Sequence, residues 1–174
     1  VVLQLAFVAE DDVVVAVAVE VVALHAAEDR VFTFVAEDVI HAAVGIHPHD
    51  AAKVDEAGWA LIEDWARDDR VVAIGETGLD ADRMFSPWDA QLENLRRNLA
   101  LALATGKPAI LHCRSKAGER DAQDALVAEL RAAGFDGVRG RAAFAGRPPA
   151  VVHSCSGPVD YAQDFFGRRA ALTV

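Results

Sequence analysis

Short apolar runs alternate with longer amphipathic segments from residue 42 onward, and this alternation constrains the fold more than any other feature of the sequence. Such spacing is typical of repeated βα units, in which each helix returns the chain to the same end of a parallel sheet. The expected fold class is therefore α/β. The apolar runs predict strands over residues 42–46, 71–74, 109–111, 150–152 and 171–174.

Three helices are expected between these strands, over residues 55–67, 86–105 and 119–133. In the longest of them, Ser86 is the expected N-cap, Pro87 occupies a tolerated first-turn position and leucines recur at helical spacing. Gly106 is expected to end this helix and Gly134 the next one. The glycine- and arginine-bearing stretch 134–149 is predicted to be a loop.

The N-terminal part of the chain has no single interpretation. Residues 13–35 fit a buried strand, a valine-rich helix, or one after the other. No low-complexity linker or internal repeat divides the sequence, so we expect one domain over residues 1–174, with 1–41 poorly assigned.

Composition narrows the functional classes. Lys and Arg number 17 against 27 Asp and Glu, a net charge of −10, so a polyanionic substrate must be captured locally. Two cysteines are too few for a secreted disulfide framework, and no apolar stretch reaches membrane-spanning length. We therefore expect a cytoplasmic protein with no membrane partner. The start lacks both the basic segment of a signal peptide and an initiating Met, which indicates a fragment.

Polar side chains follow four of the predicted strands, at the point where each apolar run ends. These residues are His47, Glu76, His112 and His153, separated by intervals that match one βα unit each. In a parallel barrel the carboxyl ends of the strands converge on one mouth, where active sites are built. Singly, each residue has a structural interpretation, but together they favour a functional site.

Two imidazoles and one carboxylate suit Zn²⁺, Mn²⁺ or a similar divalent cation. Glu76, His112 and His153 are therefore the candidate metal ligands, and hydrolysis is the expected chemistry. A His₂Cys₂ zinc site that uses Cys113 and Cys155 is disfavoured, because neighbours on a strand point to opposite faces. Both thiols are expected to pack as small apolar residues.

Several segments resemble the TatD family of metal-dependent deoxyribonucleases over about residues 42–174. No single motif is specific, but their order and spacing are. They are Gly45-Ile46-His47-Pro48-His49, Gly75-Glu76-Thr77-Gly78-Leu79-Asp80, Phe85-Ser86-Pro87 with Gln91, Lys107-Pro108-Ala109-Ile110-Leu111-His112-Cys113-Arg114, and Val152-His153-Ser154-Cys155-Ser156-Gly157.

The resemblance implies a TIM-type (β/α) barrel of the metallo-dependent hydrolase group, with one or two divalent ions (Zn, Mn or Mg). It implies that metal-activated water cleaves phosphodiester bonds of DNA, single-stranded or at a 3′ end. Glu76 would bind or bridge the metals, and His112 and His153 would complete one metal site. Arg114 would be catalytic by holding a phosphate through its planar fork, although a surface salt bridge explains an arginine there equally well.

The same resemblance gives other roles to the remaining polar residues. His47 and His49 would contact substrate only, because the family's metal-binding His-x-His belongs to a first strand that is not found here. Asp80 would support a ligand or cap a loop.

This sequence departs from the family pattern at both ends. The first-strand Asp-x-His-x-His and the final metal-binding Asp are absent, and a full barrel takes about 250 residues. The expectation is a partial barrel, truncated at both ends, whose first and last strands are missing or degenerate and whose unpaired strands favour self-association. Two alternatives stay open: an amide or lactone hydrolase of the same barrel group, and a truncated non-catalytic remnant.

Overall fold

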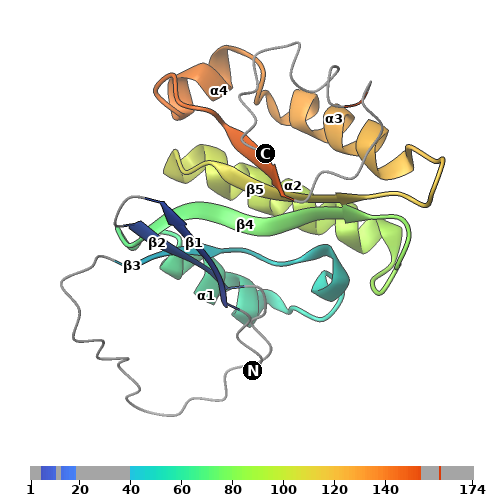
Figure 1. Ribbon diagram of the computed structural model, residues 1–174, viewed down its shortest axis with the longest axis horizontal. Coiled ribbons are helices and arrows are strands. Elements are labelled where there is room, and N and C mark those ends of the chain that lie inside the picture. The colour runs from blue at the N-terminus through green and yellow to red at the C-terminus, as the bar shows by residue number, and fades with distance from the viewer. Residues whose placement is uncertain (1–4, 11–12, 19–39, 154–160, 162–174) are drawn as a thin grey trace.

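The computed structural model describes residues 5–10, 13–18, 40–153 and 161. Its centre is a six-stranded sheet whose spatial order follows the sequence (Figure 1). β1 and β2 are antiparallel, and every later pair is parallel. The strands are β1 (Leu5–Glu10), β2 (Val13–Ala18), β3 (Ile40–Val44), β4 (Val71–Asp80), β5 (Ala109–Arg114) and β6 (Ala150–His153). Parallel strands that alternate with helices confirm the α/β prediction and form part of a barrel.

Helices connect the parallel strands in the described part of the chain. They are the 3₁₀ turn η1 (Pro48–Asp50), α1 (Glu56–Trp65), α2 (Trp88–Thr105), α3 (Asp121–Ala133) and α4 (Val138–Ala143). The three expected helices are confirmed, and α2 and α3 end at glycines in the left-handed region, as predicted. The prediction of a loop over 134–149 is wrong for residues 138–143, which form α4. This helix is too short to show a helical period in the sequence. None of the described helices is long and apolar enough to cross a membrane.

The predicted role of Ser86 as a helix N-cap is wrong. α2 begins at Trp88 after Pro87, without a side-chain cap. The Ser86 hydroxyl instead accepts a hydrogen bond from the Ala52 N–H (3.1 Å) and donates one to the His49 carbonyl (2.8 Å). A buried hydroxyl bonds whichever backbone groups surround it, and here they belong to a distant turn.

β4 and β5 are longer than their apolar runs, so Glu76 and His112 lie within strands rather than after them. Gly78 explains part of this extension. Its φ is +142°, and a Cβ atom there would overlap the carbonyl oxygen of His112 on the neighbouring strand. The glycine therefore permits close pairing where a side chain would force the strands apart.

A register shift between Ile74 and Thr77 sets the faces of β4. Beyond it Gly78 pairs with His112 and Asp80 with Arg114, so the side chains of Asp80, His112 and Arg114 share one face of the sheet with Glu76. The intervening residues Leu79, Leu111 and Cys113 are buried in the main core with residues of α2 and α3. Thr77 is also buried, and its hydroxyl accepts a hydrogen bond from Asn94 of α2. Cys113 is packed as expected, whereas Cys155, residues 171–174 and most of 1–39 lie outside the described residues.

Candidate functional site

Three segments distant in the sequence meet at the carboxyl ends of β3, β4 and β5, as expected for parallel strands (Figure 1). β4 contributes Glu76 and Asp80, and β5 contributes His112. The turn that follows β3 contributes His47 and His49. The structure therefore brings two carboxylates and three imidazoles together.

The His112 ring lies between the two carboxylates. Its Nδ1 is 3.1 Å from Glu76 Oε1, and its Nε2 is 3.1 Å from Asp80 Oδ2. All three residues are buried. His49 Nε2 approaches the same Asp80 oxygen at 2.7 Å, so one carboxylate oxygen links histidines from two segments.

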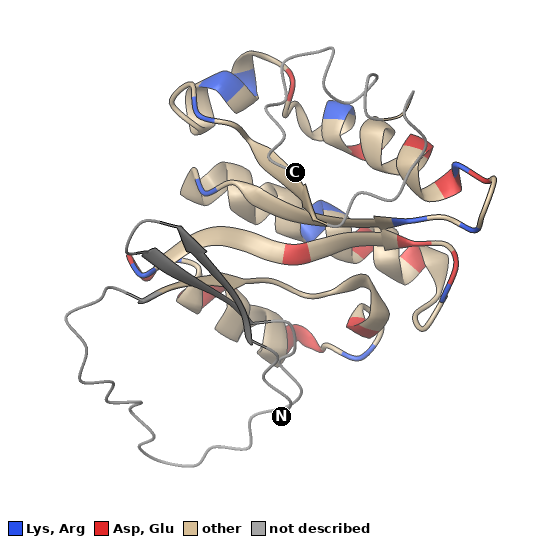
Figure 2. Cartoon of the chain, viewed as in Figure 1, with Lys and Arg blue, Asp and Glu red and all other residues tan. Residues whose placement is uncertain are grey.

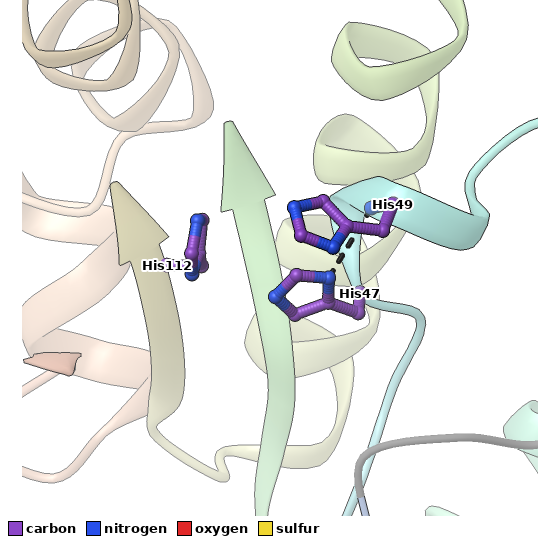
Figure 3. Close-up of side chains that lie close together, drawn as sticks. All are labelled: His47, His49 and His112. Carbon is purple, nitrogen blue, oxygen red and sulfur yellow. Dashed lines mark hydrogen bonds between the residues drawn. The ribbon is translucent and has the colours of Figure 1, made fainter. Parts of the chain in front are cut away.

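His47 faces this group from the turn after β3 (Figure 3). Its ring centroid lies 4.6 Å from that of His112 and 4.3 Å from that of His49. Nitrogen atoms of the three rings lie within 4.8 Å of one another, close enough to form a candidate metal cluster. However, His47 Nδ1 accepts a hydrogen bond from the His49 N–H (3.2 Å), so the neutral ring carries its proton on Nε2. In this tautomer His47 presents its Nε2–H toward Glu76, whose Oε1 lies 3.9 Å from Nε2.

The environment sets the charge state of these groups. Burial alone would raise the pKa values of Glu76 and Asp80. Hydrogen bonds and nearby histidines reverse this effect, lowering the pKa of Glu76 and bringing that of Asp80 to about 2. Burial, together with His112, lowers the pKa of His47 to about 4. At neutral pH the site thus presents two carboxylates and a neutral His47.

His153 and Arg114 lie at the ends of their strands. His153 is exposed at the end of β6, in register with His112, and its charge helps to lower the pKa of Glu76. Arg114 ends β5 with its Nη1 3.8 Å from Asp80 Oδ2 and its side chain 38% exposed. The structure thus places both beside the cluster and gives Arg114 an ion-pair partner there.

Buried amides on α2 hold the site segments in place. Gln91 Oε1 accepts from the Asp80 N–H (2.8 Å), and its Nε2 donates to the carbonyls of Asp80 (3.2 Å) and Ser86 (2.9 Å). Asn94 Nδ2 donates to the carbonyl of Ile46, directly before His47 (2.7 Å). No role was predicted for these amides from the sequence. A signal was present, because residues 91, 94 and 98 are amides at helical spacing on the same side of α2 as the buried leucines.

Comparison with known proteins identifies the family of this chain. The model of the family described as TatD related DNase matches residues 4–174. This chain belongs to that family. Its curated relatives include an uncharacterized metal-dependent hydrolase, YabD, of Bacillus subtilis, 35% identical over 73% of this chain and 44% of the relative. Another is the 3′-5′ ssDNA/RNA exonuclease TatD of Edwardsiella piscicida, 46% identical over 44% of this chain and 30% of the relative.

Solved structures support the same fold for this TatD-family chain. A TatD homologue from Escherichia coli matches with a TM-score of 0.61 at 25% identity, over 76% of this chain and 46% of the homologue. A TatD-family hydrolase from Entamoeba histolytica matches with a TM-score of 0.58 at 24% identity, over 76% of this chain and 40% of that one. The chain spans less than half the length of these relatives.

Proposed function

We propose that this chain is a divalent-metal-dependent hydrolase that cleaves phosphodiester bonds of single-stranded nucleic acid. The observation that carries the proposal is the placement of His112 against Glu76 and Asp80 at the carboxyl ends of β4 and β5. Buried carboxylates and an imidazole in such a position suit a divalent ion, with Zn²⁺, Mn²⁺ and Mg²⁺ as the candidates.

The residues fit a metal ion at one position. Ligands with bonds of about 2.1 Å to one ion lie roughly 3–3.5 Å apart. The separation of Glu76 Oε1 and His112 Nδ1 is 3.1 Å, within this range. We assign these two residues as ligands, with His153 as the third from the adjacent strand. When bound, the ion supplies Lewis-acid activation of water and of a phosphoryl oxygen.

Other side chains of the site act on the substrate in this proposal. We assign the Nε2–H of His47 as a donor to a phosphate oxygen, because Nδ1 is occupied by the His49 N–H and Nε2 lies 3.9 Å from Glu76 Oε1, beyond hydrogen-bond distance. The guanidinium of Arg114 holds the phosphate, since it is partly exposed and fixed beside Asp80. His49 contacts the substrate from the same turn as His47.

Several relatives are 3′-5′ ssDNA/RNA exonucleases by name, which supports a single-stranded substrate engaged at its 3′ end. The net charge of −10 means that the substrate must be attracted by local groups such as Arg114 rather than by the whole molecule. The proposal also includes a cytoplasmic location.

The test compares wild-type protein with Glu76→Gln on a single-stranded oligonucleotide, with Mn²⁺ and with chelator. We expect cleavage with Mn²⁺ only, and a loss of about 100- to 1000-fold in Glu76→Gln. The matched control is Glu93→Gln, the same substitution at an exposed position of α2. Hydrolysis of a panel of lactones without nuclease activity would favour an amide or lactone hydrolase. Inactivity on every substrate would favour a non-catalytic remnant.

Two further expectations form part of the proposal. The chain is expected to unfold as one domain, which a single cooperative thermal transition would show. Self-association through unpaired strands is expected to increase with protein concentration, because β1 and β6 form the edges of the described sheet. Sedimentation velocity over a concentration series tests it, and a monodisperse monomer would contradict it.

A further inference from the structure

We propose that Phe85 is a platform on which a nucleobase of the substrate stacks beside the cleavage site. The inference rests on the proposed function and adds to it the part of the substrate that the protein recognises. Phe85 is 62% exposed, yet its ring lies against His49 with centroids 4.7 Å apart and planes at 83°. An exposed aromatic ring therefore directly adjoins His49, a member of the candidate metal cluster.

The loop that carries Phe85, residues 81–87 between β4 and α2, is fixed on both sides of the ring. Asp80 Oδ1 accepts from the N–H groups of Asp82 (3.0 Å) and Arg83 (2.8 Å). Ser86, directly after Phe85, is fully buried and bonded to the turn after β3. Because the backbone is fixed by these bonds, the ring is preorganised and loses little freedom when a ligand stacks on it.

The surroundings of Phe85 match a nucleotide better than an apolar ligand. Met84, also exposed at 44%, extends the apolar surface. Arg83 next to it and Arg114 at the end of β5 offer positive charge for phosphate; each lies 3.8 Å from a carboxylate oxygen, of Asp82 and of Asp80 respectively. Basic and acidic residues both occur where β4 and β5 end (Figure 2). An exposed aromatic ring and arginines carried by segments that end at the same site form the combination that binds single strands, because stacking holds the base and the cations hold the backbone.

Duplex nucleic acid does not offer this contact, since its base faces are already stacked on one another. A platform on Phe85 therefore selects for unpaired bases irrespective of their identity, because every base has an aromatic face. The Phe85–His49 contact places the stacked base next to the phosphate that His47 and Arg114 are proposed to hold.

The test measures binding without cleavage, by fluorescence anisotropy in the presence of chelator. The two probes are an oligothymidylate and an oligomer of the same length made of abasic tetrahydrofuran units, which keeps the phosphates and lacks the bases. We expect Phe85→Ala to weaken oligothymidylate binding by about 5- to 100-fold and to leave abasic binding unchanged. Phe85→Trp should restore oligothymidylate binding. Val138→Ala, at an exposed apolar position of α4, is the control and should bind both probes like wild type.

Three results would overturn the inference: equal weakening on both probes, no weakening on either, or no binding of the wild-type chain to the oligothymidylate. The catalytic proposal is judged separately by adding Mn²⁺ to the same samples. If the base-dependent effect of Phe85→Ala is present but no product forms, the stacking platform stands and the proposed hydrolysis fails.

Discussion

The two faces of the sheet formed by β4 and β5 carry different kinds of side chain, although the same two strands form both. On the helix side, Leu79 and Leu111 are fully buried in a core shared with α2 and α3. On the opposite side, Glu76, Asp80 and His112 form a polar group in which His112 contacts both carboxylates. Because side chains alternate along a strand, every second residue packs in the core and the residues between them line the candidate site. A substitution on the core face should therefore change stability and leave metal binding intact.

The substitution that breaks both faces at once is Gly78→Ala. We expect it to lower the free energy of unfolding by about 4 kcal/mol or more. The new Cβ would have to displace the backbone of His112, and alanine would have to adopt the φ of +142° that Gly78 has. Gly118→Ala is the control, since Gly118 also has a positive φ (+83°) but no neighbouring atom within 4 Å; its cost should be about 1–2 kcal/mol. Urea unfolding measures both, and equal losses would refute the close-approach explanation.

A substitution confined to the helix side should affect stability alone. Leu99 on α2 is fully buried in the core, so Leu99→Ala is expected to lower the free energy of unfolding by about 3 kcal/mol. Leu61→Ala, at a 38% exposed position of α1, should cost about 0.5 kcal/mol or less. Metal affinity of the folded Leu99→Ala protein, measured by calorimetry, should equal that of wild type, and a clear change would show that the faces are coupled.

Metal binding should act through the opposite face. A divalent ion that binds only the folded chain adds about 2.7 kcal/mol at a concentration a hundredfold above its Kd, so the thermal midpoint should rise. Glu76→Gln should remove this rise, whereas Leu99→Ala should start from a lower midpoint and rise by a similar amount. Thermal unfolding followed by circular dichroism, with and without Zn²⁺ or Mn²⁺, makes the comparison. A wild-type midpoint that does not change with metal would contradict the assigned ligands.

Gln91 connects the two faces, because it is buried on α2 and bonds the end of β4. Gln91→Leu should lower the free energy of unfolding by about 2 kcal/mol by leaving the N–H and carbonyl of Asp80 without these partners. It should also weaken metal binding, since the segment that carries Asp80 loses its support. Gln123→Leu is the matched control: this glutamine is also buried, but bonds Ser115, so it should affect stability without a comparable loss of metal affinity.

The smallest expected effect is a pH dependence of the metal-free protein. The pKa of His47 is lowered from 6.5 to about 4, chiefly by burial. Between these pH values the unfolded chain binds a proton at His47, whereas the folded chain does not. The free energy of unfolding should therefore decrease as the pH falls from about 6.5 to about 4. The full shift corresponds to about 3 kcal/mol, and solvent screening of the partly exposed ring reduces the expected decrease to on the order of 1 kcal/mol. Urea titrations across this range measure the slope. His47→Gln should flatten it, and an unchanged slope would assign the effect to another group.

Much of the site could be predicted from the sequence because its residues follow apolar runs at regular intervals. Glu76 and His112 were expected to meet, and the structure places them in contact. The association of His49 with Asp80 was not predicted, because it depends on where a 3₁₀ turn lies against the end of β4. The buried role of Gln91 was missed because a glutamine on a helix usually faces solvent.

The sequence by itself determined the alternation of strands and helices, the ends of α2 and α3 at glycines, and the strands that carry the polar residues, because these depend on local periodicity and backbone preference. Only the tertiary structure decided which atoms meet. The register shift in β4 set the face of Glu76, and the long-range hydrogen bonds of Ser86 and Gln91 set the positions of the histidine turn and of Asp80. Such contacts join residues far apart in the chain, and their geometry follows from strand pairing and packing, which no local pattern specifies.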